Sequence, residues 1–267
     1  MIGDAAPEPS LLRSLAIQRR VLWALLMREV ITRFGRENIG VLWLFGEPML
    51  FTLGVTALWG AAGFDHGSAL PVVAFALTGY SSVLMWRNTV GRCANGIQSN
   101  MPLLYHRNVR VIDVLLTRIL LEMGGATASF VVLCAVYLGL EWIRPPQDLL
   151  LLVAGWLMLA WFGAALALVV GAATSYSDLV ERLWHPTAYL LFPLSGAAFM
   201  VDWLPEGGRQ VVLMLPMVHG LELVREGFFG HMIRTHYDMG YMASANLGLT
   251  LLGLFLLRDA SRRVGER

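Results

Sequence analysis

Lysine is absent from this 267-residue sequence, and all 20 basic residues are arginine. A Walker A loop needs its lysine to reach the terminal phosphates of a nucleotide, and a Schiff-base enzyme needs a lysine amine. Both kinds of site are therefore excluded from this chain. If ATP hydrolysis drives the protein, another chain must bind the ATP and its Mg²⁺, and we expect no cofactor on this one.

Charge is also scarce, at 15% of the residues, against roughly 25% in a soluble domain. Hydrophobic residues make up 57% of the chain, and the mean hydropathy is +0.61. Such a chain has too little polar surface to cover a water-soluble globule, which points to lipid as its solvent. Its apolar runs are continuous, as in helices, and do not alternate as in barrel strands. The sequence therefore predicts an all-α integral membrane protein.

Motifs for catalysis and metal binding are missing. Gly-x-Ser-x-Gly is absent, which argues against a serine hydrolase. His219, Glu222 and Glu226 resemble metal-ligand spacing, but there is no H-E-x-x-H and no second cluster, so no metal is expected. Glu222 and Arg225 are instead expected to form a local ion pair. The two cysteines are not expected to form a disulfide, because Cys93 lies in a predicted loop and Cys134 in a predicted span.

Six apolar stretches are long enough to cross a hydrocarbon core, which takes about 20 residues. The stretches are 41–62, 69–86, 111–140, 149–173, 183–201 and 241–257. They define a six-helix transmembrane domain over 41–257, preceded by a cytoplasmic segment, 1–40, and followed by a cytoplasmic tail, 258–267.

The distribution of arginine orients these spans. With the amino end in the cytoplasm, 15 arginines lie on the cytoplasmic side and 4 on the opposite side, while Arg118 falls within the third span. An excess of positive charge marks the cytoplasmic side of a membrane protein. We therefore expect both termini in the cytoplasm.

Three segments outside the spans have distinct patterns. Residues 11–32 set arginines among leucines and are predicted to form an amphipathic helix in the membrane interface. Residues 202–240 are half apolar, and their apolar stretch 211–217 is too short to span, which favours an external re-entrant or surface-lying hairpin before the last helix. Residues 87–110 form a cytoplasmic loop in this prediction. Its apolar residues suggest docking at the membrane face, although a solvated loop is the simpler alternative.

Basic and aromatic residues flank the first two spans. They form a candidate entrance for an anionic substrate, because arginine binds carboxylate or phosphate bidentately and a flat indole ring can stack on a sugar. A carboxylate inside a span usually faces a partner or a wet cavity, which adds Glu47. Orientation by positive charge, with a tryptophan belt, is an equally simple explanation. The candidate residues are Arg28, Arg33, Arg36, Trp43, Glu47, Trp86, Arg87 and Arg92.

Three motifs carry a resemblance to a known family. They are R-F-G-R-E-N-I-G-V-L-W-L-F-G-E-P at 33–48, N-M-P-L-L-Y-H-R-N-V at 100–109 and H-G-L-E-L-V-R-E-G-F-F-G at 219–230. With them the sequence resembles the membrane subunits of ABC-2 type exporters of capsular polysaccharide in Gram-negative bacteria, over nearly the whole chain. Tyr105-His106 departs from the Tyr-Pro common in relatives, and Arg107 and Arg110 stand where relatives often have lysine.

The resemblance implies a transport subunit of the bacterial inner membrane without its own ATPase site. Such subunits have six spans and work as homodimers with two ATP-binding subunits. They export lipid-linked, usually acidic polysaccharide toward periplasmic and outer-membrane export proteins, and nucleic acid is not a partner. The resemblance places the dimer interface at the first and fifth spans. The apolar content of the loop 92–108 on the cytoplasmic side predicts that it is the coupling helix that contacts this ATPase, with Asn100, Leu103, Leu104, Tyr105 and Arg107 as the coupling residues.

Alternative functions remain open at this point. An ABC-2 permease for O-antigen, teichoic acid or another lipid-linked glycan would show the same pattern. A membrane-embedded transferase would need acids or histidines converging at one depth. Glu47, Asp113 and Glu122 are the only acids within spans, and they are easier to place as packing partners of Arg118. A structural scaffold is a third possibility, and a bound ATPase subunit would distinguish export from the other two.

Overall fold

The computed structural model describes residues 11–34, 40–61, 70–104 and 109–265. Within these ranges, the side chains at 11–13, 33–34, 40–45, 47–48 and 264–265 are outside the description. The described residues contain helices, turns and bends, with no strand among them, which confirms the all-α prediction.

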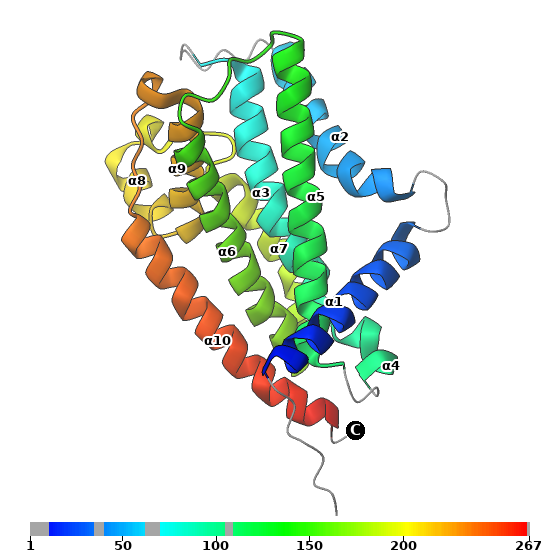
Figure 1. The fold of residues 1–267 in the computed structure, drawn as a ribbon. Helices are drawn as coiled ribbons and strands as arrows, with labels where there is room; N and C mark the ends of the chain where they lie inside the picture. The colour runs from blue at the N-terminus through cyan, green and yellow to red at the C-terminus, as the bar shows by residue number, and fades with distance from the viewer. Residues whose placement is uncertain (1–10, 35–39, 62–69, 105–108, 266–267) are drawn as a thin grey trace, which may run out of the picture.

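Ten α-helices form the described fold (Figure 1). In chain order they are α1 (Leu11–Phe34), α2 (Gly40–Ala61), α3 (Val72–Ala94), α4 (Met101–Leu104), α5 (Val111–Gly139), α6 (Leu149–Ala173), α7 (Asp178–Leu194), α8 (Glu206–Val212), α9 (Pro216–Phe229) and α10 (Met239–Gly265). Short 3₁₀ turns lie between some of them: η1 (Gln98–Asn100), η2 (Val201–Trp203) and η3 (Gly230–Met232).

Three of the described helices are long and apolar enough to cross a membrane by themselves: Val111–Gly139, Leu149–Ala173 and Met239–Arg263. The described part of α2 adds a shorter apolar helix, Met49–Ala61. The start of α6 follows directly from its sequence, because the Asp148 side chain accepts a hydrogen bond from the Leu151 N–H at 3.0 Å and so caps the helix. The chain is thus a multi-pass helical membrane protein.

Two helices differ from their predicted bounds. Helix α3 continues to Ala94, two turns past the predicted end, so Cys93 lies buried in a helix and the loop prediction for it was wrong. Helix α7 begins at Asp178 and ends at Leu194, earlier at both ends than the predicted fifth span. Ser177 caps its start by accepting from the Leu179 N–H at 3.2 Å, and Gly196, with a φ of +87°, turns the chain just beyond its end.

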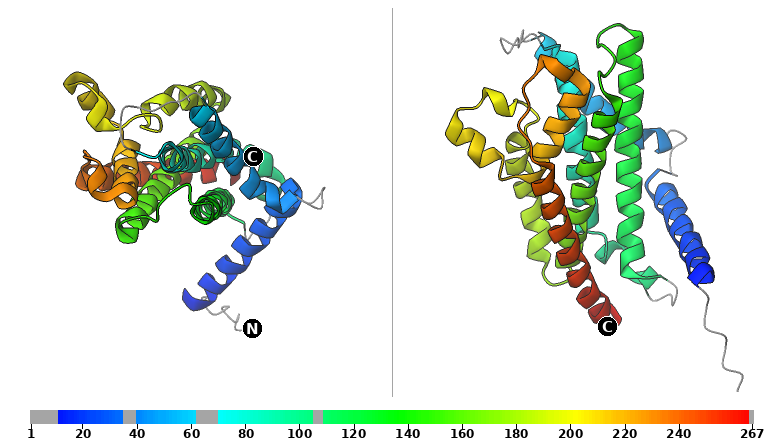
Figure 2. Two further views of the ribbon diagram at one scale, coloured as in Figure 1. Left: turned by 90° about the horizontal axis from the view of Figure 1, so that it is seen from above. Right: turned by 60° about the vertical axis from the view of Figure 1, so that its left-hand side comes forward.

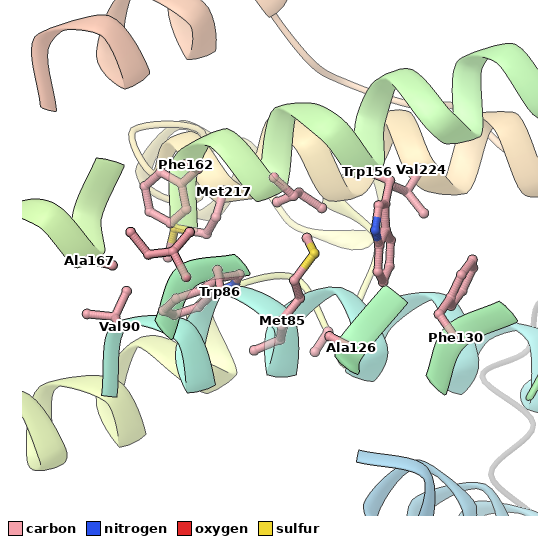
Figure 3. Close-up of a cluster of buried hydrophobic side chains, with 14 of the residues drawn as sticks. Met85, Trp86, Val90, Ala126, Phe130, Trp156, Phe162, Ala167, Met217 and Val224 are labelled. Carbon is pink, nitrogen blue, oxygen red and sulfur yellow. The ribbon is translucent and has the colours of Figure 1, made fainter. Parts of the chain in front are cut away.

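The core lies where α3, α5, α6 and α9 meet. Trp86 packs among Val90, Phe162 and Met217 at its centre (Figure 3). Helices α3 and α6 approach closely because α6 carries Gly163 there, where a Cβ atom would lie 3.0 Å from the Cα of Trp86. Small residues at crossing points are the usual device for close packing of helices in membranes.

The bundle has two distinct ends (Figures 1 and 2). We call the α1 end the one where α1, α4 and the carboxyl end of α10 lie. At the opposite α9 end, α9 finishes beside the connection between α5 and α6, where the Asp148 N–H donates to the Gly227 carbonyl at 2.8 Å. Helix α1 lies against α5, with Leu25 buried, so protein covers part of the helix that was predicted to lie in lipid.

Candidate functional site

The first polar cluster lies at the α1 end and joins four elements of the chain. Its members come from α1, α3, η1 and α5: Arg28, Glu29, Arg92, Ser99, Asn100, Arg118 and Glu122. We refer to it as the α1-end cluster.

Arg118 is the centre of the α1-end cluster. Its Nε lies 3.3 Å from Glu29 Oε1 on α1, and its Nη1 donates to the Arg92 carbonyl on α3 at 2.6 Å. Its Nη2 donates to the Ser99 hydroxyl on η1 at 2.7 Å. Because the guanidinium group has donors in several directions, one side chain ties three elements to α5.

A second connection links α1 to η1. Arg28 donates through Nη1 to Asn100 Oδ1 at 2.8 Å, and the Asn100 amide nitrogen donates to the Gly96 carbonyl at 2.9 Å. On the other side of the cluster, Arg92 Nε lies 3.5 Å from Glu122 Oε1. Arg28, a predicted entrance residue, thus binds Asn100, a predicted coupling residue.

The entrance arginines whose side chains are described do not all gather in one place. Arg28 and Arg92 belong to the α1-end cluster, whereas Arg87 points to α7 and lies 5.3 Å from the Tyr189 ring and 5.7 Å from the Phe192 ring. The remaining candidates lie outside the described residues or have side chains outside the description: Arg33, Arg36, Trp43, Glu47, Tyr105 and Arg107.

Trp86 is a core residue and offers no open face. Its side chain is 1% exposed, and its ring packs edge-on against Phe162 with centroids 5.8 Å apart (Figure 3). The sequence suggested an interfacial ring because the predicted span ended at Trp86. Since α3 continues for two more turns, Trp86 lies well inside the bundle, and this arrangement does not support sugar stacking there.

The apolar residues of the coupling segment pack partly on the protein itself. Ile97 is buried, and Met101 and Leu104 pack against the core of the bundle. Leu103 is half-buried and lies outside that packing. Much of the apolar content that suggested a docking surface therefore serves the fold, and Leu103 is the more informative residue for testing contact with a partner.

The second polar cluster lies at the α9 end and is centred on Arg225, which is fully buried. Arg225 donates through Nη1 to the Phe199 carbonyl at 2.6 Å and through Nη2 to the Ala197 carbonyl at 2.9 Å. The guanidinium group also lies 4.0 Å from the centre of the Phe75 ring on α3. We call Arg225, Glu222, His219 and their partners the α9-end cluster.

Gly79 makes room for this arrangement on α3. A Cβ atom at this position would lie 2.5 Å from the Ala197 carbonyl oxygen and 2.9 Å from Arg225 Nη2. Both distances are shorter than any ordinary contact, so a glycine is needed where α3 passes the chain between α7 and η2. This requirement was not visible in the sequence.

Glu222 binds backbone N–H groups, and its charge interacts with that of Arg225 without the close ion pair that was predicted. Its carboxylate oxygens accept from the Val201 N–H at 3.4 Å and the His236 N–H at 3.1 Å, and among the described side chains no direct contact joins it to Arg225.

His219 uses both ring nitrogens in hydrogen bonds. Nδ1 accepts from the Asp238 N–H at 2.8 Å, so the proton must be on Nε2, which lies 2.8 Å from the Leu213 carbonyl. Nearby, His236 Nε2 lies 2.9 Å from Asp202 Oδ1, and this hydrogen bond lowers the pKa of Asp202. The α9-end cluster thus holds the segments before and after α9 in one place.

Polar clusters at both ends of a bundle that contains long apolar helices define a helical integral membrane protein. A model of the ABC-2 type transporter family matches residues 20–229 of this chain, which is more than half of its length. The chain belongs to the ABC-2 type transporter family.

Curated relatives cover almost the whole chain. It is 44% identical over 260 residues to the capsule polysaccharide export inner-membrane protein CtrC of Neisseria meningitidis serogroup B, covering 97% of this chain and 98% of CtrC. It is 42% identical over 252 residues to the corresponding protein BexB of Haemophilus influenzae, covering 94% and 95%. A more distant relative is the polysialic acid transport protein KpsM of Escherichia coli, 26% identical over 91% of this chain and 94% of KpsM.

Proposed function

We propose that this chain is the transmembrane subunit of an ABC exporter that carries lipid-linked capsular polysaccharide across the bacterial inner membrane. The observation that carries the proposal is its identity of more than 40%, over nearly the full length of both chains, with capsule polysaccharide export inner-membrane proteins. ATP hydrolysis takes place in a separate subunit, because a chain without lysine lacks the residue that a Walker A loop requires.

Deletion of the gene in its own host tests this function. We expect surface polysaccharide to disappear and polymer to accumulate inside the cell, and a plasmid copy to restore the surface signal. Unchanged surface polysaccharide in the deletion strain would refute the proposal. The measurement is antibody or lectin staining of intact cells against permeabilised cells.

The proposed topology has six spans with both termini in the cytoplasm, so the α1 end faces the cytoplasm. Helices α2, α3, α5, α6, α7 and α10 form the spans. The 17 residues of α7 reach only about 25 Å at 1.5 Å per residue, short of a hydrocarbon core of about 30 Å. This supports an external re-entrant hairpin built from α8 and α9, which completes the crossing that α7 leaves unfinished.

The proposed assembly is a homodimer that contacts through α2 and α7. These helices are neighbours, since the Phe51 and Phe192 rings are 6.4 Å apart, and together they expose large apolar side chains, among them Leu58 and Leu190. Cysteines introduced one at a time at Leu58 and Leu190 test this interface, in a Cys134→Ser background that retains only the buried Cys93. A symmetric cross-link at either position supports it, and no cross-link at both contradicts it.

The proposed contact with the ATP-binding subunit lies at α4 and its flanks. Leu103→Asp tests this contact, because Leu103 is the half-buried leucine outside the core packing. We expect the variant to insert normally but to export poorly, with ATP hydrolysis uncoupled from transport. Leu179→Asp, at an exposed leucine at the start of α7, is the control. Normal export by Leu103→Asp would contradict a contact between the ATP-binding subunit and α4.

A further inference from the structure

A pocket of about 420 Å³ lies at the α1 end, between the start of α5 and the end of α10. Its volume is within the range of roughly 300–1,000 Å³ that is typical of small-ligand sites. Most of its wall is apolar and comes from Leu104, Val109, Ile112, Leu254 and Leu257. Apart from Leu104, which belongs to α4 in the proposed contact with the ATP-binding subunit, the residues that line this pocket take no part in the proposed function or in the two polar clusters.

Positive charge also lines this pocket. Arg110, Arg258 and Ser261 contribute its polar groups, and no acidic residue is among the described residues that line it. Within the described part of the chain, Arg258 makes no hydrogen bond or ion pair. The nearby carboxylate of Asp113 is fully buried and accepts from the Arg110 N–H at 2.9 Å and from Gln18, so it does not line the pocket.

At the pocket, the sequences of α5 and α10 both change between basic and apolar residues. On α10, apolar Leu254 and Leu257 are followed directly by Arg258, and on α5, Arg110 comes directly before apolar Val111. Such a change marks the boundary between hydrocarbon and water in a membrane protein. A ligand that fits here must have an anionic group on the arginine side and an apolar part on the leucine side.

We propose that this pocket binds an acidic phospholipid of the surrounding bilayer. Its phosphate lies between the Arg110 and Arg258 guanidinium groups, which provide charge-assisted hydrogen bonds. A headgroup hydroxyl donates to the Ser261 oxygen, and an acyl chain lies along Leu254 and Leu257. Basic pockets between helices at this boundary are suited to anionic lipid headgroups. This site is independent of which polymer the protein exports.

The bound lipid joins two parts of the chain that are far apart in sequence. Leu104, which lines the pocket, belongs to α4 in the proposed coupling segment, and Arg258 belongs to the carboxyl-terminal helix. A lipid held by both fixes the end of α10 against the start of α5. It therefore gives the coupling segment a second point of attachment, in addition to the α1-end cluster.

Native mass spectrometry of the purified full-length protein tests the site. The probes are phosphatidylglycerol and phosphatidylcholine with identical acyl chains, added separately in detergent. We expect phosphatidylglycerol to be retained in preference to phosphatidylcholine. The variant Arg110→Ala/Arg258→Ala should lose about thirtyfold in retention. Arg182→Ala, an exposed arginine at the same end, is the matched control and should bind like the wild type.

The outcomes separate the possibilities. Equal retention of the two lipids by the wild type, or full retention by the double variant, would overturn the proposal, as would an equal loss in Arg182→Ala. Displacement of phosphatidylglycerol by millimolar inorganic phosphate would show that the pocket takes free phosphate, which also overturns a lipid site. Even if the double variant is unstable, equal retention of the two lipids by the wild type would still overturn the proposal.

Discussion

The two polar clusters differ in what their charged groups bind. At the α9 end, Arg225 and Glu222 bind backbone carbonyl and N–H groups and are almost completely buried. At the α1 end, Arg28 and Arg118 bind mainly side chains from other elements, and the side chains of Arg118 and Glu29 keep 11% and 12% exposure. A backbone group moves only with its whole segment, so a hydrogen bond to it is held in place by the fold. A side chain can rotate away, so a charged group bound to it can change partners.

This difference suggests a division of roles within the molecule. The α9-end cluster fixes the shape of the segment from η2 to the start of α10, because each hydrogen bond there would leave a buried polar group unpaired if it were broken. The α1-end cluster joins α1 and η1 to the bundle mainly through pairs of side chains, which can separate without breaking a backbone hydrogen bond. Movement driven by a partner is therefore expected at the α1 end.

The largest effect is expected from Arg225→Met. The change removes two charge-assisted hydrogen bonds and the contact with Phe75, and it leaves the Phe199 and Ala197 carbonyls without their partner. We expect a loss of about 3–5 kcal/mol in the free energy of unfolding. Unfolding of the purified protein in mixed detergent micelles measures it.

Arg209→Met is the control for this change. Arg209 is also an arginine of the α9 end, but its partners Asp202 and Glu206 lie 3.7 Å away in partly exposed pairs. Its loss should cost less than about 1 kcal/mol. Similar costs for the two variants would mean that the α9-end cluster is not a fixed element.

A smaller effect is expected from Gly79→Ala. The added methyl group would lie 2.5 Å from the Ala197 oxygen, so α3 or the chain after α7 must shift. Such overpacking costs about 1–3 kcal/mol. Gly124→Ala on α5 is the matched control, because a Cβ atom there meets nothing within 4 Å. A stability of Gly79→Ala equal to that of Gly124→Ala would contradict the close approach.

Secondary structure was the more predictable part of this molecule. The prediction of a span at 149–173 matches α6, because an uninterrupted apolar run follows a capping aspartate. Helix α3 was predicted too short, since Arg87 and Arg92 resemble the end of a span. In the structure their charges are balanced by the α7 rings and by Glu122, which allows the helix to continue.

The candidate site was less predictable, because it depends on contacts between distant segments. Arg118 stands inside a span, and such a charge needs a partner. The sequence offered Glu47, Asp113 and Glu122, whereas the structure adds Glu29 from α1. Glu222 and Arg225 are three residues apart on one helix, which favoured an ion pair. Only the fold reveals the backbone groups of 197–201 and 236 beside them.

An intermediate effect is expected for the pair Glu29 and Arg118 in a double-mutant cycle. Glu29→Gln, Arg118→Met and the double variant should give a coupling energy of about 0.5–2 kcal/mol, because both side chains are largely covered. The exposed pair Asp259 and Arg263, 3.0 Å apart, is the comparison and should couple by less than about 0.5 kcal/mol. If the two pairs had equal coupling energies, the contact between Glu29 and Arg118 would contribute no more than an exposed surface pair.

The smallest effect on stability, below about 0.5 kcal/mol, is expected from replacing single arginines by lysine at Arg33, Arg36, Arg87 and Arg92. Membrane orientation depends on summed positive charge and tolerates lysine at any of these positions. Recognition of phosphate or carboxylate groups on the exported polymer would not tolerate lysine, because lysine lacks the planar pair of donors that binds these groups bidentately.

If these arginines form the proposed entrance, surface polysaccharide should fall severalfold in at least one of the four variants at matched protein level. Arg182→Lys, an exposed arginine on α7 at the same end of the bundle, should export normally. Arg92 is the most informative position, because it belongs to the α1-end cluster, whereas Arg87 packs on the α7 rings. Normal export by all four would mean that these arginines serve orientation alone. The exchangeable contacts of the α1 end would then serve coupling to the ATPase and not binding of the polymer.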